Sequence, residues 1–218
     1  MNAQRTRAQL ERTRIAAIIR ATDGDRAARA ADAVISGGFT IIELTLNTPG
    51  AIDLIARLAG RPGLVIGAGT VMTADQVRQA ADAGARFIVS PHVDASVISA
   101  ALACGAVVIP GAYTPTEMCA ARRAGAHWVK LFPAPADIAS YVRQVRGPFA
   151  DMPVFPTAGV TPENFIDILK AGAVGVGFVS SLFRPDEMQA GDFDAIRARA
   201  RSIVTTLRDT GIADQPPG

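Results

Sequence analysis

Short apolar runs alternate along the chain with longer stretches in which apolar and polar residues are mixed. Eight such runs cover residues 15–19, 40–44, 64–66, 87–89, 107–109, 128–132, 154–155 and 174–179. Continuous apolar runs of this length are typical of strands in a parallel sheet whose two faces are both covered. The mixed stretches between them are long enough for helices, so the pattern predicts strands alternating with helices.

Seven glycines end the predicted helices at nearly even spacing, with intervals of 20 to 25 residues. They are Gly37, Gly60, Gly84, Gly105, Gly125, Gly147 and Gly172. Glycine favours this position because it accepts the left-handed conformation that ends many helices. The spacing therefore indicates a repeated strand–helix unit.

Capping residues mark where several helices should begin. Thr73 and Thr114 are each followed three residues later by Gln76 and Glu117, which is the pattern of a capping box. The sequence Thr161-Pro162-Glu163 places proline at a first helical position.

Eight strand–helix units in about 200 residues predict an α/β fold of the (β/α)8 TIM-barrel type. We expect a single domain, with an N-terminal helix over residues 1–14, the barrel over 15–210 and a flexible tail over 211–218. A doubly wound sheet is the alternative, but it does not explain the even period. Gly67-x-Gly69 lacks the third glycine of a dinucleotide-binding loop.

Composition narrows the classes of protein. Hydrophobic residues make up 49% of the 218 residues and charged residues 19%, which is enough to fill a core. No apolar run is long enough for a membrane span, and a net charge of +2 does not suggest a nucleic-acid partner. Two cysteines and two histidines favour neither a disulfide framework nor a metal centre, so we expect a reducing, cytoplasmic location. A mitochondrial transit peptide is the less favoured interpretation of the arginine-rich start.

Two charged residues interrupt the predicted strands. The chain has only two lysines, Lys130 and Lys170. Lys130 lies within the run 128–132, and Glu43 lies within the run 40–44. A buried charge is costly unless it is paired or neutralised. One interpretation is an ion pair that only stabilises the lumen. The favoured one is a desolvated, neutral lysine amine that attacks a carbonyl, with a carboxylate that moves protons.

Six motifs at the ends of successive strands carry a resemblance to a known family. They are Glu43-Leu44-Thr45-Leu46, Gly67-Ala68-Gly69-Thr70-Val71, Ser90-Pro91-His92, Pro110-Gly111-Ala112-Tyr113-Thr114, Val129-Lys130-Leu131-Phe132-Pro133 and Pro156-Thr157-Ala158-Gly159-Val160. In this order they resemble the 2-keto-3-deoxy-6-phosphogluconate aldolase family, which includes 6-phosphogalactonate aldolases and overlaps with 4-hydroxy-2-oxoglutarate aldolase. The match runs over residues 15–181, nearly the whole chain.

The resemblance implies a class I aldolase: a trimeric (β/α)8 barrel that needs no metal and no cofactor. By the motif match, Lys130 would form the Schiff base and Glu43 would be the general acid/base. The expected substrate is a phosphorylated keto sugar acid, cleaved to pyruvate and glyceraldehyde 3-phosphate. This would place the protein in carbohydrate metabolism, in a pathway of the Entner–Doudoroff kind.

The resemblance also implies residues that bind the substrate. Thr70 and Thr157 would lie near the pyruvyl carboxylate and the imine, although a strand-end hydrogen bond or helix cap is an equal alternative. Pro91 and Phe132 would shape the pocket wall, with ordinary barrel packing as the alternative. Arg20 follows the first run and is a candidate anion contact, because a guanidinium binds carboxylate or phosphate through two hydrogen bonds; a plain surface arginine is the alternative.

The phosphate site departs from the family pattern. Ala158 and Val179 stand where the family usually has glycine, which leaves Gly159 and Ser180 as the best candidates. Asn47 follows Leu46 as in galactonate-type relatives, or is a helix N-cap, so the preferred epimer stays open. Aldolase activity on another 4-hydroxy-2-oxo acid, and a phosphosugar barrel enzyme without a Schiff base, are the alternative functions.

Overall fold

The computed structural model describes residues 3–212, and its strands form one parallel sheet that curls into a nearly closed barrel. The strands are β1 (Ile15–Ile19), β2 (Ile41–Thr45), β3 (Val65–Gly69), β4 (Phe87–Ser90), β5 (Val107–Ala112), β6 (Val129–Leu131), β7 (Val154–Pro156) and β8 (Val176–Phe178). Their order is β7-β6-β5-β4-β3-β2-β1-β8. The predicted TIM barrel is confirmed, and the doubly wound alternative is wrong.

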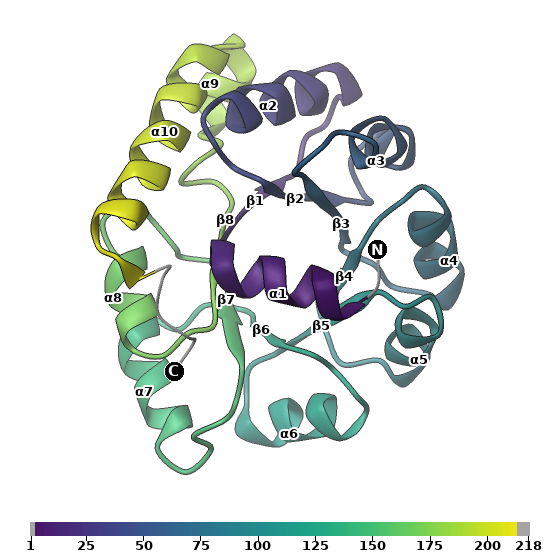
Figure 1. Cartoon of the computed structure of the whole chain (residues 1–218), viewed down its shortest axis with the longest axis vertical. Helices are drawn as coiled ribbons and strands as arrows, with labels where there is room; N and C mark the ends of the chain where they lie inside the picture. Colours follow the sequence, from purple (N-terminus) through teal and green to yellow (C-terminus); the bar gives the residue numbers. More distant parts are fainter. Residues whose placement is uncertain (1–2, 213–218) are drawn as a thin grey trace.

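Helices surround this sheet, and one further helix, α1 (Ala3–Thr13), lies across an end of it, as Figure 1 shows. The surrounding helices are α2 (Gly24–Ser36), α3 (Ala51–Ala59), α4 (Ala74–Asp82), α5 (Ala95–Ala103), α6 (Pro115–Arg123), α7 (Ile138–Arg146), α8 (Phe165–Lys170), α9 (Pro185–Ala190) and α10 (Phe193–Asp209). Buried aliphatic residues of the helices and of the outward faces of the strands form the larger core.

Most of the predicted helix ends are found in the structure. Thr114 and Glu117 form a full capping box, and Thr73 accepts a hydrogen bond from the backbone N–H of Gln76. The glycines Gly84, Gly105, Gly125 and Gly172 have positive φ just after the C-cap residue of a helix. The expected left-handed conformation is wrong for three others, Gly37, Gly60 and Gly147, which follow their helices with right-handed backbone angles.

One predicted helix start is wrong. The segment from Thr161 forms a turn, in which the Asn164 side-chain oxygen accepts from the Thr161 N–H, and α8 begins only at Phe165. The turn satisfies the backbone donor that a proline-initiated helix would have left free.

Helix α1 lies across one open end of the barrel in Figure 1. Its Leu10 joins the lumen cluster, which contains inward-facing residues such as Ile41, Trp128 and Phe155. The rings of Trp128 and Phe155 pack with centroids 5.5 Å apart. Within residues 3–212, apolar packing therefore fills the N-terminal end of the barrel, and the cavity lined by Glu43 and Lys130 lies toward the other end.

The domain division at residues 14/15 and 210/211 stays a prediction, and residues 213–218 of the expected tail lie outside the described residues. Within residues 3–212, no helix combines the length and the apolar character needed to cross a membrane.

Candidate active site at the barrel mouth

Alternate residues of four strands lead from the apolar lumen to the C-terminal mouth of the barrel. The series are Ala16, Ile18 and Arg20 from β1; Ile41, Glu43 and Thr45 on β2; Trp128, Lys130 and Phe132 from β6; and Phe155, Thr157 and Gly159 from β7. The first member of each series belongs to the lumen cluster, and the later members line one cavity. Because side chains alternate along a strand, the same pleat that fills the lumen also brings polar groups together at its mouth.

Glu43 is fully enclosed at the bottom of this cavity. Its side chain is 1% exposed, and neither carboxyl oxygen has a hydrogen-bond partner within the described part of the chain. Burial raises the pKa of Glu43, while the positive charges of Lys130 and Arg20 act in the opposite direction. A carboxyl group in such a place takes up and releases a proton closer to neutral pH, which suits a general acid/base.

Glycine at position 69 makes room for this carboxyl group. A Cβ atom built on Gly69 would come within 1.9 Å of Oε1 of Glu43. Gly69 lies opposite Thr45 in the β2–β3 ladder, and Gly67 lies opposite Glu43. Gly69, the second glycine of the Gly-Ala-Gly-Thr motif, therefore leaves space for the carboxyl group of Glu43 on the neighbouring strand.

Lys130 is 9% exposed and lies between the lumen and the cavity. Burial lowers the pKa of Lys130, Arg20 lowers it further, and Glu43 opposes the shift. Lys130 and Glu43 do not form a direct ion pair among the ion pairs of residues 3–212. The interpretation of Lys130 and Glu43 as a purely structural ion pair is thus not supported by a direct contact, whereas a partly neutral Lys130 amine is suited to nucleophilic attack.

Arg20 is held over the mouth by Thr70. Its Nη2 donates to the Thr70 hydroxyl at 3.3 Å. Thr70 has a φ of 57°, a left-handed conformation that is strained for a β-branched residue. Thr70 does not line the cavity, so its contact with the site is made through Arg20.

One cavity of about 520 Å³ brings together seven of the ten residues that the sequence singled out. They are Arg20, Glu43, Lys130, Phe132, Thr157, Gly159 and Ser180. The Nζ atom of Lys130 lies 4.9 Å from the centroid of the Phe132 ring. The cavity continues into an outer cavity of about 1010 Å³ that shares Arg20 and Ser180 with it.

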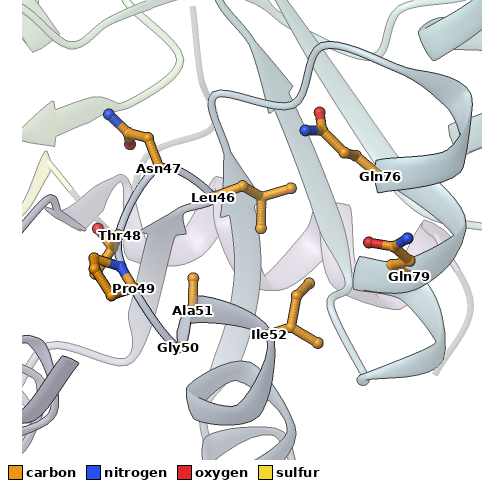
Figure 2. A pocket seen from close by; sticks show the side chains of 9 residues that line it. All are labelled: Leu46, Asn47, Thr48, Pro49, Gly50, Ala51, Ile52, Gln76 and Gln79. Atoms are coloured by element: carbon orange, nitrogen blue, oxygen red, sulfur yellow. The ribbon is translucent and has the colours of Figure 1, made fainter.

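Asn47 and Pro91 lie apart from the inner cavity. Asn47 lines the outer cavity and also a smaller hollow of about 370 Å³ between the loop after β2 and α4. In Figure 2 the amide group of Asn47 points away from Gln76 and Gln79, which lie on the other side of that hollow. Pro91 lines neither the inner nor the outer cavity; its carbonyl oxygen packs where a Cβ of Gly111 would lie, at 2.3 Å.

The loops after β7 and β8 form the wall on which a phosphate was expected. Gly159 has a φ of 71°, a conformation that favours glycine, and its carbonyl accepts from Asn164 Nδ2 at 2.9 Å. The Ser181 hydroxyl donates to the Val160 carbonyl at 2.6 Å, which links the two loops. Ala158 and Val179 line the cavity despite replacing the family's glycines.

Thr45 is a cavity residue that the sequence analysis did not propose. It is buried, and its hydroxyl donates to the Ile19 carbonyl at 3.2 Å. Its position two residues after Glu43 on the same strand face was the available signal. Within residues 3–212, no three or more His, Cys, Asp or Glu side chains gather closely enough to hold a metal ion.

Comparison with known proteins gives a consistent answer. The family model for KDPG and KHG aldolase matches residues 6–199. A probable 2-dehydro-3-deoxy-6-phosphogalactonate aldolase of Rhizobium meliloti (strain 1021) is 40% identical over 193 residues, covering 87% of this chain and 88% of that protein. The 2-dehydro-3-deoxy-6-phosphogalactonate aldolase of Escherichia coli (strain K12) is 37% identical, covering 77% and 83%.

Solved structures agree with these relatives. A native KDPGal structure superimposes with a TM-score of 0.81 at 34% identity, over 89% of this chain and 94% of that one. KDPG aldolase from Legionella pneumophila, with pyruvate captured as a covalent carbinolamine intermediate, gives 0.77 at 26% identity over 90% and 96%. The barrel fold is thus shared with aldolases, which are carbon–carbon lyases. The chain belongs to the KDPG and KHG aldolase family, which confirms the family indicated by the six motifs.

Proposed function

We propose that the protein is a class I aldolase that cleaves a 2-keto-3-deoxy-6-phospho sugar acid to pyruvate and glyceraldehyde 3-phosphate. The observation that carries this proposal is the enclosed pair of Lys130 and Glu43, each shifted by burial toward its neutral form. Two similar proteins are named as 2-dehydro-3-deoxy-6-phosphogalactonate aldolases, which supports the same chemistry. Lys130 is the Schiff-base residue and Glu43 the general acid/base.

The neutral amine of Lys130 attacks the C2 ketone of the substrate, and the protonated Glu43 gives its proton to the hydroxyl group that leaves as water, so that the protonated imine forms. Glu43, now ionised, then takes the proton of the C4 hydroxyl, directly or through a water. As the C4 carbonyl forms, the C3–C4 bond breaks and its electron pair moves to the imine nitrogen, giving an enamine. Glyceraldehyde 3-phosphate departs, a proton returns to C3, and hydrolysis of the imine releases pyruvate.

The other cavity residues bind the two ends of the substrate. Thr157 lies beside Lys130 in the cavity and is placed to hold the pyruvyl part, and Arg20 provides a positive charge for an anionic group. Gly159 and Ser180, on the wall formed by the two linked loops, bind the phosphate, chiefly through backbone N–H groups. Phe132 covers the lysine, while Asn47 and Pro91 act from outside the inner cavity.

Reductive trapping tests the Schiff base. Incubation with pyruvate and borohydride should attach one pyruvyl group to Lys130, located by peptide mass spectrometry. Lys130→Met should abolish the adduct and the cleavage activity. Lys170→Met is the matched control, because Lys170 is the other lysine of the chain and is exposed on α8.

An adduct that survives in Lys130→Met, or the absence of any adduct in active enzyme, would contradict the proposal. The second result would favour a phosphosugar barrel enzyme that works without an imine. Cleavage in the presence of EDTA should continue, since the proposed steps use only side chains.

We propose further that both phosphorylated epimers, gluconate- and galactonate-derived, are turned over. The imine chemistry occurs at C2, and the relatives include galactonate- and gluconate-type enzymes at 40% and 35% identity. Steady-state kinetics with both epimers, with and without phosphate, measures this. A preference above ~10²-fold, worth about 2.7 kcal/mol, would show that the pocket distinguishes the C4 configuration directly.

We propose that the protein works as a cytoplasmic homotrimer in sugar-acid catabolism of the Entner–Doudoroff kind. The family resemblance supports the trimer. A similar chain, at 34% identity, occurs in a designed protein cage made by fusing symmetric oligomeric domains.

A further inference from the structure

One wall of the active cavity is carried by the segment 179–190, whose C-terminal part, α9, has less apolar anchoring than its beginning. Val179, Ser180 and Pro185 line both the inner and the outer cavity, and α9 continues from Pro185. Within the described chain, α9 has no buried residue, and its N-terminus has no side-chain cap. Figure 1 shows this short helix beside α10 on the outside of the barrel.

A single guanidinium on α10 holds this segment at two points. Nη1 of Arg199 donates to the Leu182 carbonyl at 2.9 Å and to Oε2 of Glu187 at 2.7 Å, while Nη2 pairs with Oε1 of Glu187. Both side chains are only 14% exposed. The two contact points lie on either side of Pro185, so one rigid fork fixes the turn that enters α9.

Other contacts hold the segment less completely. Leu182 and Phe183 are buried, and the Ser181 hydroxyl ties the start of the segment to Val160. Glu187 also approaches Arg184, but only at 4.0 Å, and the side chain of Arg184 is exposed. The buried apolar residues therefore fix the beginning of the segment, and Arg199, together with the half-buried Met188 that packs against the core, fixes its continuation into α9.

We infer that Arg199 is a positioning residue of the aldolase: through Leu182 and Glu187 it sets the place of the wall that carries Ser180 and Pro185, and so determines how tightly the phosphorylated end of the substrate binds. This inference rests on the proposed function. Arg199 does not line either of these two cavities among the described residues, so its effect reaches the substrate only through that wall.

The substitution Arg199→Lys keeps the positive charge but removes the planar fork, since an ammonium group cannot make these three hydrogen bonds in the same geometry. We expect the KM for the phosphorylated substrate to rise about 10-fold, a loss of about 1.4 kcal/mol. The kcat and the rate of pyruvate trapping on Lys130 should stay within about two-fold, because pyruvate lacks the phosphorylated end.

Arg197→Lys is the matched control. Arg197 lies on the same helix and pairs with Asp194, but that pair is exposed and lies away from the active cavity. Glu187→Gln removes the partner from the other side, should raise KM similarly, and should add little in the double variant with Arg199→Lys because both act through one contact. If Arg199→Lys does not fold, as judged by circular dichroism, Glu187→Gln gives the same test.

The outcomes separate the inference from the proposed function. Wild-type protein without pyruvate trapping would overturn the proposed function itself. Trapping in the wild type, with the same KM in Arg199→Lys and Arg197→Lys, would overturn only the role of Arg199. A fall in the rate of pyruvate trapping as large as the rise in KM in Arg199→Lys would also overturn it, because the effect would not be confined to the phosphate wall.

Discussion

At the scale of residues, the site contains three charged groups, and the pKa values of two of them, Lys130 and Glu43, are shifted by burial and by the neighbouring charges. Glu43 raises the pKa of Lys130, whereas Arg20 lowers it, and burial lowers it most. Attack on a ketone requires the neutral amine, so the rate of imine formation should increase as the pH rises through the pKa of Lys130. Substitution of Glu43 and substitution of Arg20 should therefore shift the pH profile of imine formation in opposite directions.

Glu43→Gln removes the charge that raises the pKa of Lys130, so the midpoint of imine formation should move to lower pH. Arg20→Met removes a charge that lowers this pKa, so the midpoint should move to higher pH. Trapping of pyruvate with cyanoborohydride as a function of pH measures both. The midpoint is the quantity to compare, because the amplitude also reports the loss of proton transfer by Glu43. Shifts of the same sign in the two variants would contradict the electrostatic account.

Gly69→Ala should lower kcat without touching a catalytic side chain. The added Cβ would meet Oε1 of Glu43 at 1.9 Å and force the carboxyl group to move. Loss of well-placed acid/base catalysis typically costs 10²–10⁴-fold, so we expect a loss on the order of 10²-fold in kcat.

The control for this substitution is Gly60→Ala, since a Cβ at Gly60 would meet no atom within 4 Å. Retained activity in Gly69→Ala would mean that the position of the Glu43 carboxyl group is not critical.

Much of the site could be predicted from the sequence, because strand-end motifs in a barrel converge wherever the strands end. Lys130 and Glu43 were identifiable as charges inside apolar runs. The Thr70–Arg20 contact and the Arg199–Glu187 pair were not. Both join residues on different elements, and nothing in the local sequence encodes such a pairing.

At the scale of elements, α1 is the part that distinguishes the two ends of the barrel. Leu10 is 4% exposed and packs into the lumen cluster below the site. This contact stabilises the barrel from the end opposite to the chemistry. Stability and activity should therefore respond differently when it is lost.

Leu10→Ala should reduce the free energy of unfolding by about 2–5 kcal/mol, as expected for truncation of a buried leucine. The kcat/KM of the folded enzyme should stay nearly unchanged, because Leu10 lies at the far end of the lumen. Urea unfolding and steady-state kinetics measure the two quantities. Leu102→Ala is the control, since Leu102 is 39% exposed on α5 and should change stability far less. A large drop in kcat/KM would show that the floor of the barrel shapes the site.

The strands were predictable in number and order but not at every boundary. Strand β3 extends to Gly69 and β5 to Ala112, beyond the predicted ends at 66 and 109, because Gly-Ala-Gly and Pro-Gly-Ala lack large apolar side chains. Conversely, β8 is shorter than the apolar run 174–179. Apolar runs report burial, whereas strand ends are set by the hydrogen-bonded ladder.

At the scale of the whole molecule, the barrel joins residues that are far apart in the sequence. Arg20 and Ser180 line the same cavity because β8 pairs with β1 in the sheet. Such a site forms only when both ends of the chain are in place. Removal of β8 should abolish activity rather than reduce it.

The proposed trimer predicts a mass in solution of about three times the 22.7 kDa of the chain. Sedimentation equilibrium or light scattering measures it. A monomer with full activity would contradict the trimer while leaving the aldolase chemistry intact.

Within residues 3–212, α1 and the lumen cluster fill the N-terminal end of the barrel, so the proposed reaction has access to solvent through the C-terminal mouth. Lys130 lines only the inner cavity, whereas Ser180, on the wall proposed to bind the phosphate, also lines the outer cavity. The pyruvyl group bonded to Lys130 cannot leave while the aldehyde still occupies the cavity between it and the opening. Turnover should therefore release the phosphorylated aldehyde first and pyruvate last, and product-inhibition kinetics should reveal this sequence of departures.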